Sequence, residues 1–394
     1  MTPDAVIAGI GTSRAFGLRL ELSPLRLQLE ALASALADSG LDKDEIDGVG
    51  TSHGSPGGVD YDEFVLAAGL DVRWASQKWT HGRWAATTVT EAALAVQAGL
   101  ASCIAVIDTT TSGRGYGRHL TGLGGRPTRE GLRELGGSHG EWDVHGVDTP
   151  GVATALVARH YMDRYGATED DLARVAMAFR AHAELNPMAI MAAKPMTAES
   201  YFAEPVIVRP FRRADFCLDS EGATCLLVCD RRRAAQLRQP AVAIAAAAGI
   251  HASRDDHILF ARPGLGVGLQ AAGPWRQPEL DVFGRAGIGP GDVDGLYVYD
   301  SFGSNLWMVL ERFGFCAEGE APGYVRDTGI GLDSVRPVNT NGGLMSEAHQ
   351  SGYGHLVEMV RQLRGQAGPR QIPGAAVLQW ATPRGDSLIL TKGG

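Results

Sequence analysis

An internal repeat limits the fold of this chain more than any other feature of its sequence. The segment GLDKDEIDGVGTS at residues 40–52 has a counterpart, GIGPGDVDGLYVY, at residues 287–299. Each contains a glycine turn, an acidic segment and a short apolar strand. Positions that lie 247 residues apart pair Gly40 with Gly287, Ile46 with Val293, Asp47 with Asp294 and Gly48 with Gly295. This repeat predicts two halves built from the same supersecondary unit.

The segments around the two copies alternate between strand and helix patterns. Short apolar runs predict strands at residues 5–11, 103–108, 223–230, 241–249 and 375–380. Helical spacing and capping residues predict helices at residues 25–39, 89–99, 169–185, about 279–286 and 354–365. This alternation predicts an α/β fold whose mixed sheets are covered on both faces. We expect an N-terminal half at residues 1–240, with a loop insertion at about 109–215, and a C-terminal half at residues 241–394.

Composition and charge argue against several classes of protein. The net charge of −9 makes nucleic acid an unsuitable main partner. The longest apolar run, residues 240–250, is far shorter than a membrane span, and the first residues show no signal-peptide pattern. The five cysteines form no CxxC pair, so we expect reduced thiols and a cytoplasmic protein. His139, Asp143 and His145 match no metal-ligand spacing, so no metal site is expected.

A glycine-rich turn at residues 337–354 precedes the last predicted helix. Gly342 and Gly343 allow another group to approach the backbone closely, and the turn delivers His349 and Tyr353 to the helix N-terminus. The N–H groups at a helix N-terminus suit a developing oxyanion. The alternative interpretation is a tight turn before an amphipathic surface helix whose outer side carries Glu358 and two arginines.

Four stretches together resemble a known family. They are EIDGV at 45–49, NPMAIMAAKPMT at 186–197, YDSFGSNLWMVLERFGFCAEGE at 299–320 and PVNTNGGLMSEAHQSGYG at 337–354. This pattern resembles the thiolase superfamily, and within it the sterol-carrier and lipid-transfer-protein type of thiolase-like protein. The resemblance implies a five-layered αβαβα fold, a homodimer and acyl-CoA substrates.

Departures from the thiolase pattern indicate a different chemistry. The region that carries the thiolase nucleophile, residues 81–91, contains no cysteine, and Gln379 and Trp380 stand where the second family cysteine is expected. A covalent acyl-enzyme is therefore not expected. The YDSF motif and His349 resemble the branch that acts as aldolases on CoA-thioester side chains of steroids, although that branch often has tyrosine at position 349. The resemblance also implies a small companion protein with an OB-fold and a zinc ribbon.

Retro-aldol cleavage of a β-hydroxyacyl-CoA needs a base for the hydroxyl proton, donors for the thioester oxygen and an acid for the α-carbon. We expect His349 as base or donor and Tyr299 as proton donor. Asp300 can orient a neighbour, although strand alternation can turn it to the opposite face. Structural and catalytic roles both remain open for Tyr353 and His355.

Thr87 and Thr88 are expected either to bind the thioester or to cap a helix. Coenzyme A enters as part of the substrate, and no separate cofactor is expected. Two other hypotheses are a non-covalent acyltransferase and a non-catalytic subunit that binds lipid or acyl-CoA.

Overall fold

The computed structural model of the 394-residue chain describes residues 5–53, 59–78, 84–111, 150–249 and 282–393. Nine strands form one mixed sheet in the order β3-β2-β4-β7-β1-β8-β11-β10-β9, and β5 and β6 form a small separate pair. The strands are β1 (Ala5–Thr12), β2 (Gly48–His53), β3 (Trp74–Lys78), β4 (Cys103–Thr111), β5 (Val206–Val208), β6 (Phe211–Arg212), β7 (Glu221–Asp230), β8 (Val242–Ala248), β9 (Gly295–Val298), β10 (Val377–Ala381) and β11 (Ser387–Lys392).

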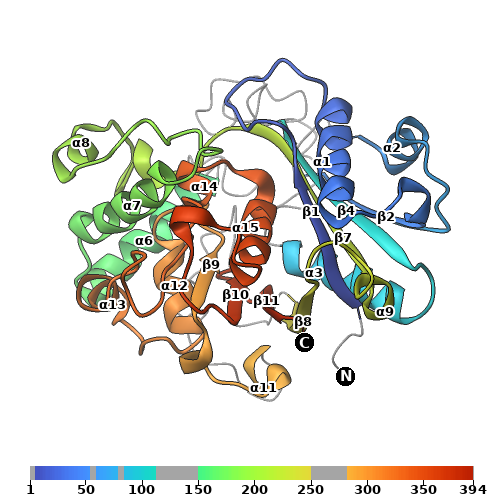
Figure 1. Cartoon of the computed structure of the whole chain (residues 1–394). Helices are drawn as coiled ribbons and strands as arrows, with labels where there is room; N and C mark the ends of the chain where they lie inside the picture. The colour runs from blue at the N-terminus through green and yellow to red at the C-terminus, as the bar shows by residue number, and fades with distance from the viewer. Residues whose placement is uncertain (1–4, 54–58, 79–83, 112–149, 250–281, 394) are drawn as a thin grey trace, which may run out of the picture.

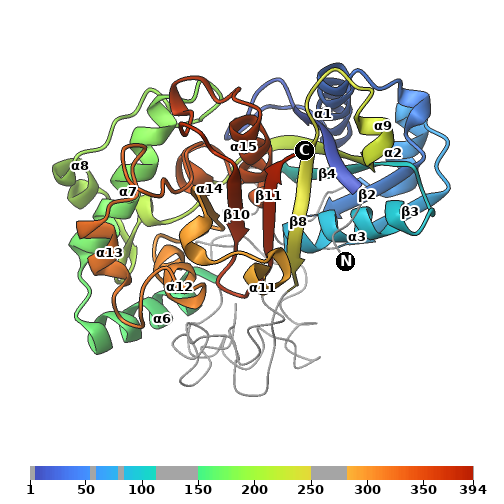
Figure 2. The same ribbon diagram turned by 60° about the horizontal axis from the view of Figure 1, so that its bottom comes forward.

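Helices surround this sheet and also lie between its two parts (Figures 1 and 2). They are α1 (Pro24–Ser39), α2 (Tyr61–Ala68), α3 (Ala85–Gln97), α6 (Pro150–Tyr165), α7 (Glu169–Glu184), α8 (Ala198–Ala203), α9 (Arg231–Ala234), α11 (Val282–Ala286), α12 (Asn305–Arg312), α13 (Ala321–Asp327), α14 (Gly343–Ser346) and α15 (Tyr353–Leu363). None of the helices in the described ranges is long and apolar enough to cross a membrane.

The two parts of the sheet have the same topology. In the first part β2 pairs with β4 in parallel, and β4–β7 and β7–β1 are antiparallel. In the second part β9 pairs with β10 in parallel, and β10–β11 and β11–β8 are antiparallel. The strands β1 and β8 join the two parts through a short antiparallel contact. The sequence repeat therefore corresponds to a structural duplication.

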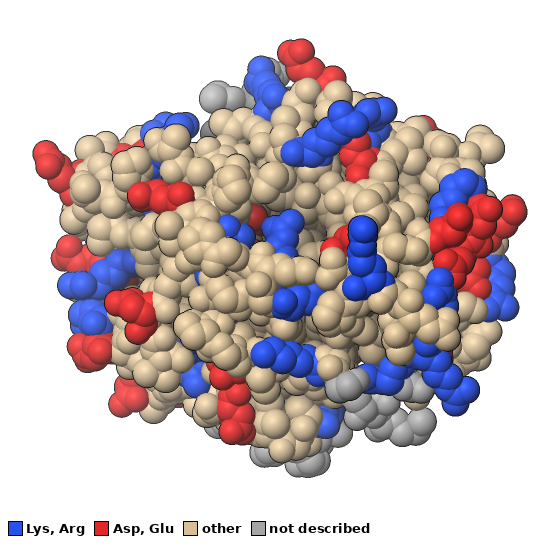
Figure 3. Space-filling model, in the orientation of Figure 1, with Lys and Arg blue, Asp and Glu red and all other residues tan. Residues whose placement is uncertain are grey.

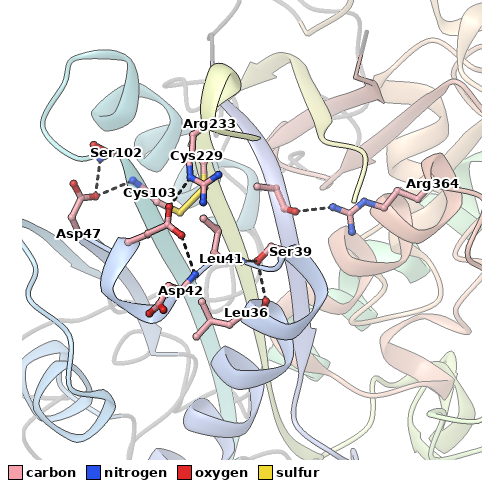
Figure 4. Close-up of a disulfide and its surroundings, with 12 residues drawn as sticks. Leu36, Ser39, Leu41, Asp42, Asp47, Ser102, Cys103, Cys229, Arg233 and Arg364 are labelled. Carbon is pink, nitrogen blue, oxygen red and sulfur yellow. Dashed lines mark hydrogen bonds and ion pairs between the residues drawn. A yellow bond between two sulfur atoms is a disulfide. The ribbon is translucent and has the colours of Figure 1, made fainter. Parts of the chain in front are cut away.

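Asp47 and Asp294 show why the repeat retains an aspartate. The Asp47 carboxylate accepts the backbone N–H groups of Ser102 and Cys103 at 2.7 and 2.9 Å, where β4 begins (Figure 4). The Asp294 carboxylate accepts those of Ala376 and Val377 at 2.8 and 2.9 Å, where β10 begins. Each aspartate thus fixes the register of the parallel strand beside it, because it satisfies N–H groups that the ladder leaves unpaired.

Three apolar cores define the layers. The helices α3 and α15 share one core with strands of both parts of the sheet. The outer face of the first part packs against α1, and the outer face of the second part packs against α7 and α12. Alternate residues of β7 illustrate the division, since Leu226 and Val228 join the central core while Cys225 and Leu227 join the outer one. The layers follow the order helix, sheet, helix, sheet, helix, which confirms the predicted αβαβα architecture.

The helix α15 corrects one interpretation of its sequence. Both sides of this helix are enclosed, so it is a central helix and not an amphipathic surface helix. Glu358 is buried and forms two hydrogen bonds of 3.0 Å with the Arg370 guanidinium, and Arg364 reaches Asp38 at 2.8 Å. Polar residues can occupy an interior helix when each is paired in this way.

Charged side chains of both signs are interspersed on the face shown in Figure 3.

The cysteines give a second correction. Cys103 and Cys229 stand opposite each other on the neighbouring strands β4 and β7, with their Cα atoms 4.3 Å apart, and form a disulfide (Figure 4). The expectation of five reduced thiols was therefore wrong. The two residues lie 126 positions apart in the chain, and only the strand register brings them together. A cytoplasmic location, which that expectation favoured, stays a prediction.

Candidate active site

Tyr299 and His349 meet at the junction of β9 and the turn before α15. The Tyr299 hydroxyl lies 3.3 Å from His349 Nε2, and the two ring centroids are 6.2 Å apart. Tyr299 is only 5% exposed, and His349 is partly exposed. Two residues that the sequence analysis selected from separate motifs thus face each other, within the reach of one substrate.

Backbone contacts fix both members of this pair. The Tyr299 N–H donates to the Ala381 carbonyl at 3.0 Å, and Asn305 Nδ2 donates to the Tyr299 carbonyl at 3.0 Å. The His349 N–H donates to Ser220 Oγ at 2.8 Å. Hydrogen bonds to main-chain atoms thus hold the backbone of both residues in place.

The turn after His349 has an unusual backbone. Gln350 and Ser351 adopt φ angles of 28° and 45°, a region that costs non-glycine residues about 1–3 kcal/mol each. The Gln350 side chain donates to Thr110 Oγ1 at 2.7 Å and anchors the turn to β4. At Gly352, which has a φ of 83°, a Cβ atom would lie 2.3 Å from the Trp380 ring. The glycine thus lets the turn pack closely against Trp380, whose ring lies beside Tyr299.

Burial sets the charge of His349. Desolvation is the main cause that lowers the pKa of His349 to about 4; Asp300 opposes this shift and His355 adds to it. The imidazole is therefore neutral near pH 7 and has a free lone pair for a proton. Within the described residues, no hydrogen-bond partner lies on its Nδ1 atom.

Asp300 turns away from Tyr299, as strand alternation predicted. Its carboxylate accepts the N–H groups of Leu344 and Met345 at 2.9 and 3.2 Å, and it contacts His355 Nε2 at 3.0 Å. A Cβ atom at Gly343 would lie 2.1 Å from this carboxylate. Asp300 therefore organises the turn before His349 and does not face the reacting groups.

The four residues predicted to bind substrate have protein partners. A Cβ atom at Gly342 would lie 2.7 Å from Ala183, and Gly343 makes room for Asp300, so both glycines face protein. Thr88 Oγ1 donates to the Trp84 carbonyl at 3.0 Å, a bond to the helix backbone four residues earlier and not an N-cap. Thr87 Oγ1 contacts the Asp386 carboxylate at 2.5 Å.

Asp386 occupies the N-terminus of α3. It accepts the N–H groups of Ala86 and Thr87 at 2.9 and 3.0 Å, and its burial raises the pKa of Asp386 to about 7. Donors that could otherwise hold an oxyanion are thus already bound to a carboxylate. Tyr353, the first residue of α15, is 1% exposed and packs into the central core.

Sequence analysis missed several residues around the pair. The Trp380 ring packs 6.2 Å from Tyr299 and 5.4 Å from His355, between centroids. Trp380 had a sequence signal, since it stands near the expected position of the second family cysteine. Cys217 had none; burial and the carboxylates of Asp300 and Asp219 raise its pKa, so its thiol stays protonated at neutral pH.

The described residues contain no group of three His, Cys, Asp or Glu side chains that could hold a metal ion. His139, Asp143 and His145, which the sequence analysis considered for such a site, lie outside the described residues.

Comparisons with solved structures define the class of protein. The chain superimposes on an Ltp2–ChsH2(DUF35) aldolase with a TM-score of 0.85 and 28% identity, covering 99% of this chain and 98% of that one. It also matches an acetyl-CoA acetyltransferase from Syntrophomonas wolfei with a TM-score of 0.67 and 15% identity, over 100% of both chains, which bears on the fold alone. Residues 272–382 match the family described as thiolase C-terminal domain-like. The fold is therefore thiolase-like.

Relatives of similar sequence identify the family within the thiolase-like class. The 17-hydroxy-3-oxo-4-pregnene-20-carboxyl-CoA lyase of Mycobacterium tuberculosis is 34% identical over 377 residues, which cover 93% of this chain and 92% of that protein. The steroid side-chain-cleaving aldolase of Thermomonospora curvata is 32% identical over 364 residues, which cover 92% and 90%. The chain belongs to this thiolase-like family of side-chain-cleaving aldolases and is a carbon–carbon lyase.

Proposed function

We propose that this chain cleaves a β-hydroxyacyl-CoA thioester with a bulky, steroid-like β-substituent by a retro-aldol reaction that uses no cysteine nucleophile. The contact between Tyr299 and His349 carries the proposal, because it places a neutral imidazole and a phenol at one point of a thiolase-like site. The name of the Mycobacterium tuberculosis relative supports the substrate class, since its substrate bears both a hydroxyl and a carboxyl-CoA.

In this mechanism His349 accepts the β-hydroxyl proton. As the hydroxyl carbon becomes a ketone, the bond to the α-carbon breaks and its electron pair passes into the thioester enolate. Tyr299 donates a proton to the α-carbon and recovers one from His349 through their contact, so no proton is gained or lost overall. The products are a ketone and a shortened acyl-CoA.

The surroundings of the pair support a mechanism without an acyl-enzyme. Asp386 fills the N-terminus of α3, the helix that follows the expected nucleophile region. The thiol of Cys217 is protonated at neutral pH, and a protonated thiol is a poor nucleophile. A retro-aldol reaction needs no covalent intermediate, whereas acyl transfer by the usual thiolase route does.

The direct test incubates the purified protein, with and without a companion, with 17-hydroxy-3-oxo-4-pregnene-20-carboxyl-CoA. We expect equal amounts of a steroid ketone and a shortened acyl-CoA. The matched control is the analogue without the 17-hydroxyl, which should remain intact because it has no proton for His349. Acyl transfer without ketone formation would favour a non-covalent acyltransferase, and binding without turnover would favour a non-catalytic subunit; either result contradicts the proposal.

We also propose that the chain works as a homodimer with a small companion protein of the OB-fold and zinc-ribbon type. The description of the Ltp2–ChsH2(DUF35) aldolase, which names two components, supports a companion. The homodimer is carried over from the thiolase superfamily, and the cytoplasmic location stays a prediction of the sequence.

A further inference from the structure

A buried chain of polar side chains runs behind the catalytic pair. His355 Nε2 lies 3.0 Å from Asp300 Oδ1, and His355 Nδ1 lies 3.1 Å from Asn341 Oδ1. Asn341 Nδ2 donates to Glu347 Oε2 at 2.5 Å, and Asn186 Nδ2 donates to Glu347 Oε1 at 2.8 Å. This network of side chains thus connects the carboxyl groups of Asp300 and Glu347 through the imidazole of His355 and the amide of Asn341.

The hydrogen-bond partners determine where the protons are. The Glu347 carboxylate accepts from two amide groups, which turns the Asn341 NH2 toward Glu347 and its oxygen toward His355. Asp300 accepts two backbone N–H groups besides its contact with His355. Both nitrogens of His355 therefore face acceptor oxygens, and only a doubly protonated ring donates to both.

This network of hydrogen-bonded side chains is closed to solvent. Asp300 and His355 are 0% exposed, Asn341 and Asn186 are 1% exposed, and Glu347 is 3% exposed. A Cβ atom at Gly354 would lie 3.0 Å from Glu347 Oε2, so the glycine leaves room for the carboxylate. A buried cation is stable only when an anion and hydrogen bonds compensate for its lost hydration, and here the Asp300 carboxylate contacts the ring directly, whereas burial and Glu358 raise the pKa of Glu347 at the other end.

We propose that His355 is a positioning residue for the lyase reaction, held as a buried imidazolium between Asp300 and Asn341, where it fixes the Asp300 carboxylate that binds the turn before His349. This inference rests on the proposed function of Tyr299 and His349. His355 acts through Asp300, which follows Tyr299 in the chain and holds the backbone of Leu344 and Met345 before His349. It touches neither member of the pair by hydrogen bond.

The electrostatic part of the proposal depends on the groups around His349. Tyr299 and Asp300 approach from the end of β9, and His355 approaches from α15. Asp219 precedes Ser220, whose hydroxyl accepts the His349 N–H, and Tyr353 and Cys217 belong to the neighbouring elements. The positive charge of His355 lowers the pKa of His349, and the negative charge of Asp300 raises it.

Removing the His355 charge has a predictable sign. In His355→Gln the side chain can still donate to Asp300 but carries no charge. The pKa of His349 then rises, because the positive charge that opposed its protonation is gone while Asp300 remains. Since His349 must be unprotonated to act as base, activity is lost at a higher pH than in the wild-type enzyme.

The first experiment needs neither a substrate nor a variant. Residue-assigned ¹⁵N NMR of the histidine side chains in the unliganded protein at pH 7 should show two protonated nitrogens on His355. A single protonated nitrogen, the mark of a neutral tautomer, would overturn the proposal. This result is independent of any activity, so it also stands if the proposed reaction fails.

The second experiment compares His355→Gln with wild type on 17-hydroxy-3-oxo-4-pregnene-20-carboxyl-CoA, with the companion protein present in both assays. We expect kcat to fall about 10- to 100-fold with little change in KM, because a misplaced reacting group costs that much. We also expect the acid limb of the kcat–pH profile to move upward by about one pH unit. An unmoved acid limb contradicts the proposal.

His182→Gln is the matched control. This histidine is also buried, on α7, but it contacts the Asn339 carbonyl at 3.2 Å and has no contact with Asp300 among the described residues. We expect its acid limb to coincide with that of wild type. An equal shift in both variants would mean that loss of any buried histidine causes the effect, which also contradicts the proposal. A wild-type enzyme without cleavage activity would instead contradict the proposed function.

Discussion

Tyr299 and His349 contact each other through the two atoms that can exchange a proton, and the rest of the site serves to keep them there. The hydroxyl and Nε2 are 3.3 Å apart, which lets one proton cycle through the pair during turnover. Asp300, the next residue in the chain after Tyr299, is bound to Leu344, Met345 and His355 instead. The division between reacting and supporting residues follows from this geometry.

The pair gives the first prediction at this scale. Tyr299→Phe and His349→Ala should each lower kcat about 10²- to 10⁴-fold, because each removes a proton-transfer group, with a much smaller change in KM. Steady-state kinetics measure both parameters. Thr88→Ala is the control and should lower kcat far less, since its hydroxyl donates only to the Trp84 carbonyl at the start of α3. A variant at position 299 or 349 that keeps wild-type kcat would remove that residue from the mechanism.

The cysteines give the second prediction. Alkylation by iodoacetamide should leave activity essentially intact, because Cys103 and Cys229 are joined and the other three thiols are buried or half-buried. Burial raises the pKa of Cys217 and Cys225, and it raises that of Cys316 to about 12, so thiolates are scarce at neutral pH. Mass spectrometry should measure the modification in parallel. Inactivation that follows modification of one cysteine, and that substrate blocks, would establish a covalent mechanism instead.

The sequence led to the contact between Tyr299 and His349 but not to the residues that support it, and the catalytic roles of the pair stay a prediction. Tyr299 and His349 stand in motifs at a strand end and before a helix, positions that a parallel α/β fold brings together. The partner of Asp300 could not be inferred, because His355 lies 55 residues away and their contact depends on how α15 docks. Thr87 had two open roles, and only the distant Asp386 decides between them.

At the scale of elements, the two central helices differ in what occupies their N-termini. A carboxylate, Asp386, caps α3, whereas α15 follows the strained turn that carries His349. In the first half, the N-terminus of α3 is thus bound to the turn between β10 and β11. In the second half, the side chain at the corresponding place before the helix is that of His349. The duplicated fold carries its reacting groups on one half, which the repeat itself does not reveal.

The buried cap gives the third prediction. The pKa of Asp386 is raised to about 7 from an ordinary value of 3.8, so the folded protein binds a proton that the unfolded chain releases. This contribution to stability is complete below about pH 4 and is lost as the pH rises through 7. Between pH 5 and pH 8, wild type should therefore lose about 1–3 kcal/mol more unfolding free energy than Asp386→Asn.

Urea unfolding at the two pH values measures this difference. Asp215→Asn is a useful companion variant, because burial also raises the pKa of Asp215 to about 7 and its effect should have the same sign. If wild type and Asp386→Asn lose equal stability between pH 5 and pH 8, the carboxylate does not carry a raised pKa.

Helix and strand positions were largely accessible from sequence, and burial was less so. Ser23 caps α1 at the predicted place, and Thr168 caps α7. The polar side of α15 suggested a surface helix, but Glu358 is hydrogen-bonded to Arg370 inside the protein. Alternation and capping are local signals, whereas the burial of a paired charge depends on a residue elsewhere in the chain.

At the scale of the whole molecule, hydrogen bonds join the segment after α7 to the turn before His349. Asn186, which follows α7, donates to Glu347, and the N–H groups of Ile190 and Met191 donate to the carbonyls of Glu347 and Ser346 at 2.9 and 3.1 Å. The segment at 186–197 is therefore bound to the same turn that presents His349. A displacement of this segment would therefore also displace Ser346 and Glu347, and with them the turn that carries His349.

Assembly gives the last prediction. If the substrate site is completed by a companion protein, this chain alone should show low or no lyase activity, and addition of an OB-fold, zinc-ribbon partner should raise kcat or lower KM at a fixed concentration of the chain. The reason is that a bulky steroid needs more apolar surface than the Tyr299–His349 pair supplies, and water must be excluded from the enolate.

Two measurements separate the partners. Analytical ultracentrifugation of the chain by itself should show a homodimer, and titration with the companion should bring activity to a plateau at a fixed stoichiometry. Tyr299→Phe is the control, because it should bind the companion normally and remain inactive. Full activity from an isolated monomer would contradict both the dimer and the companion, while leaving the reaction and the roles of Tyr299 and His349 untouched.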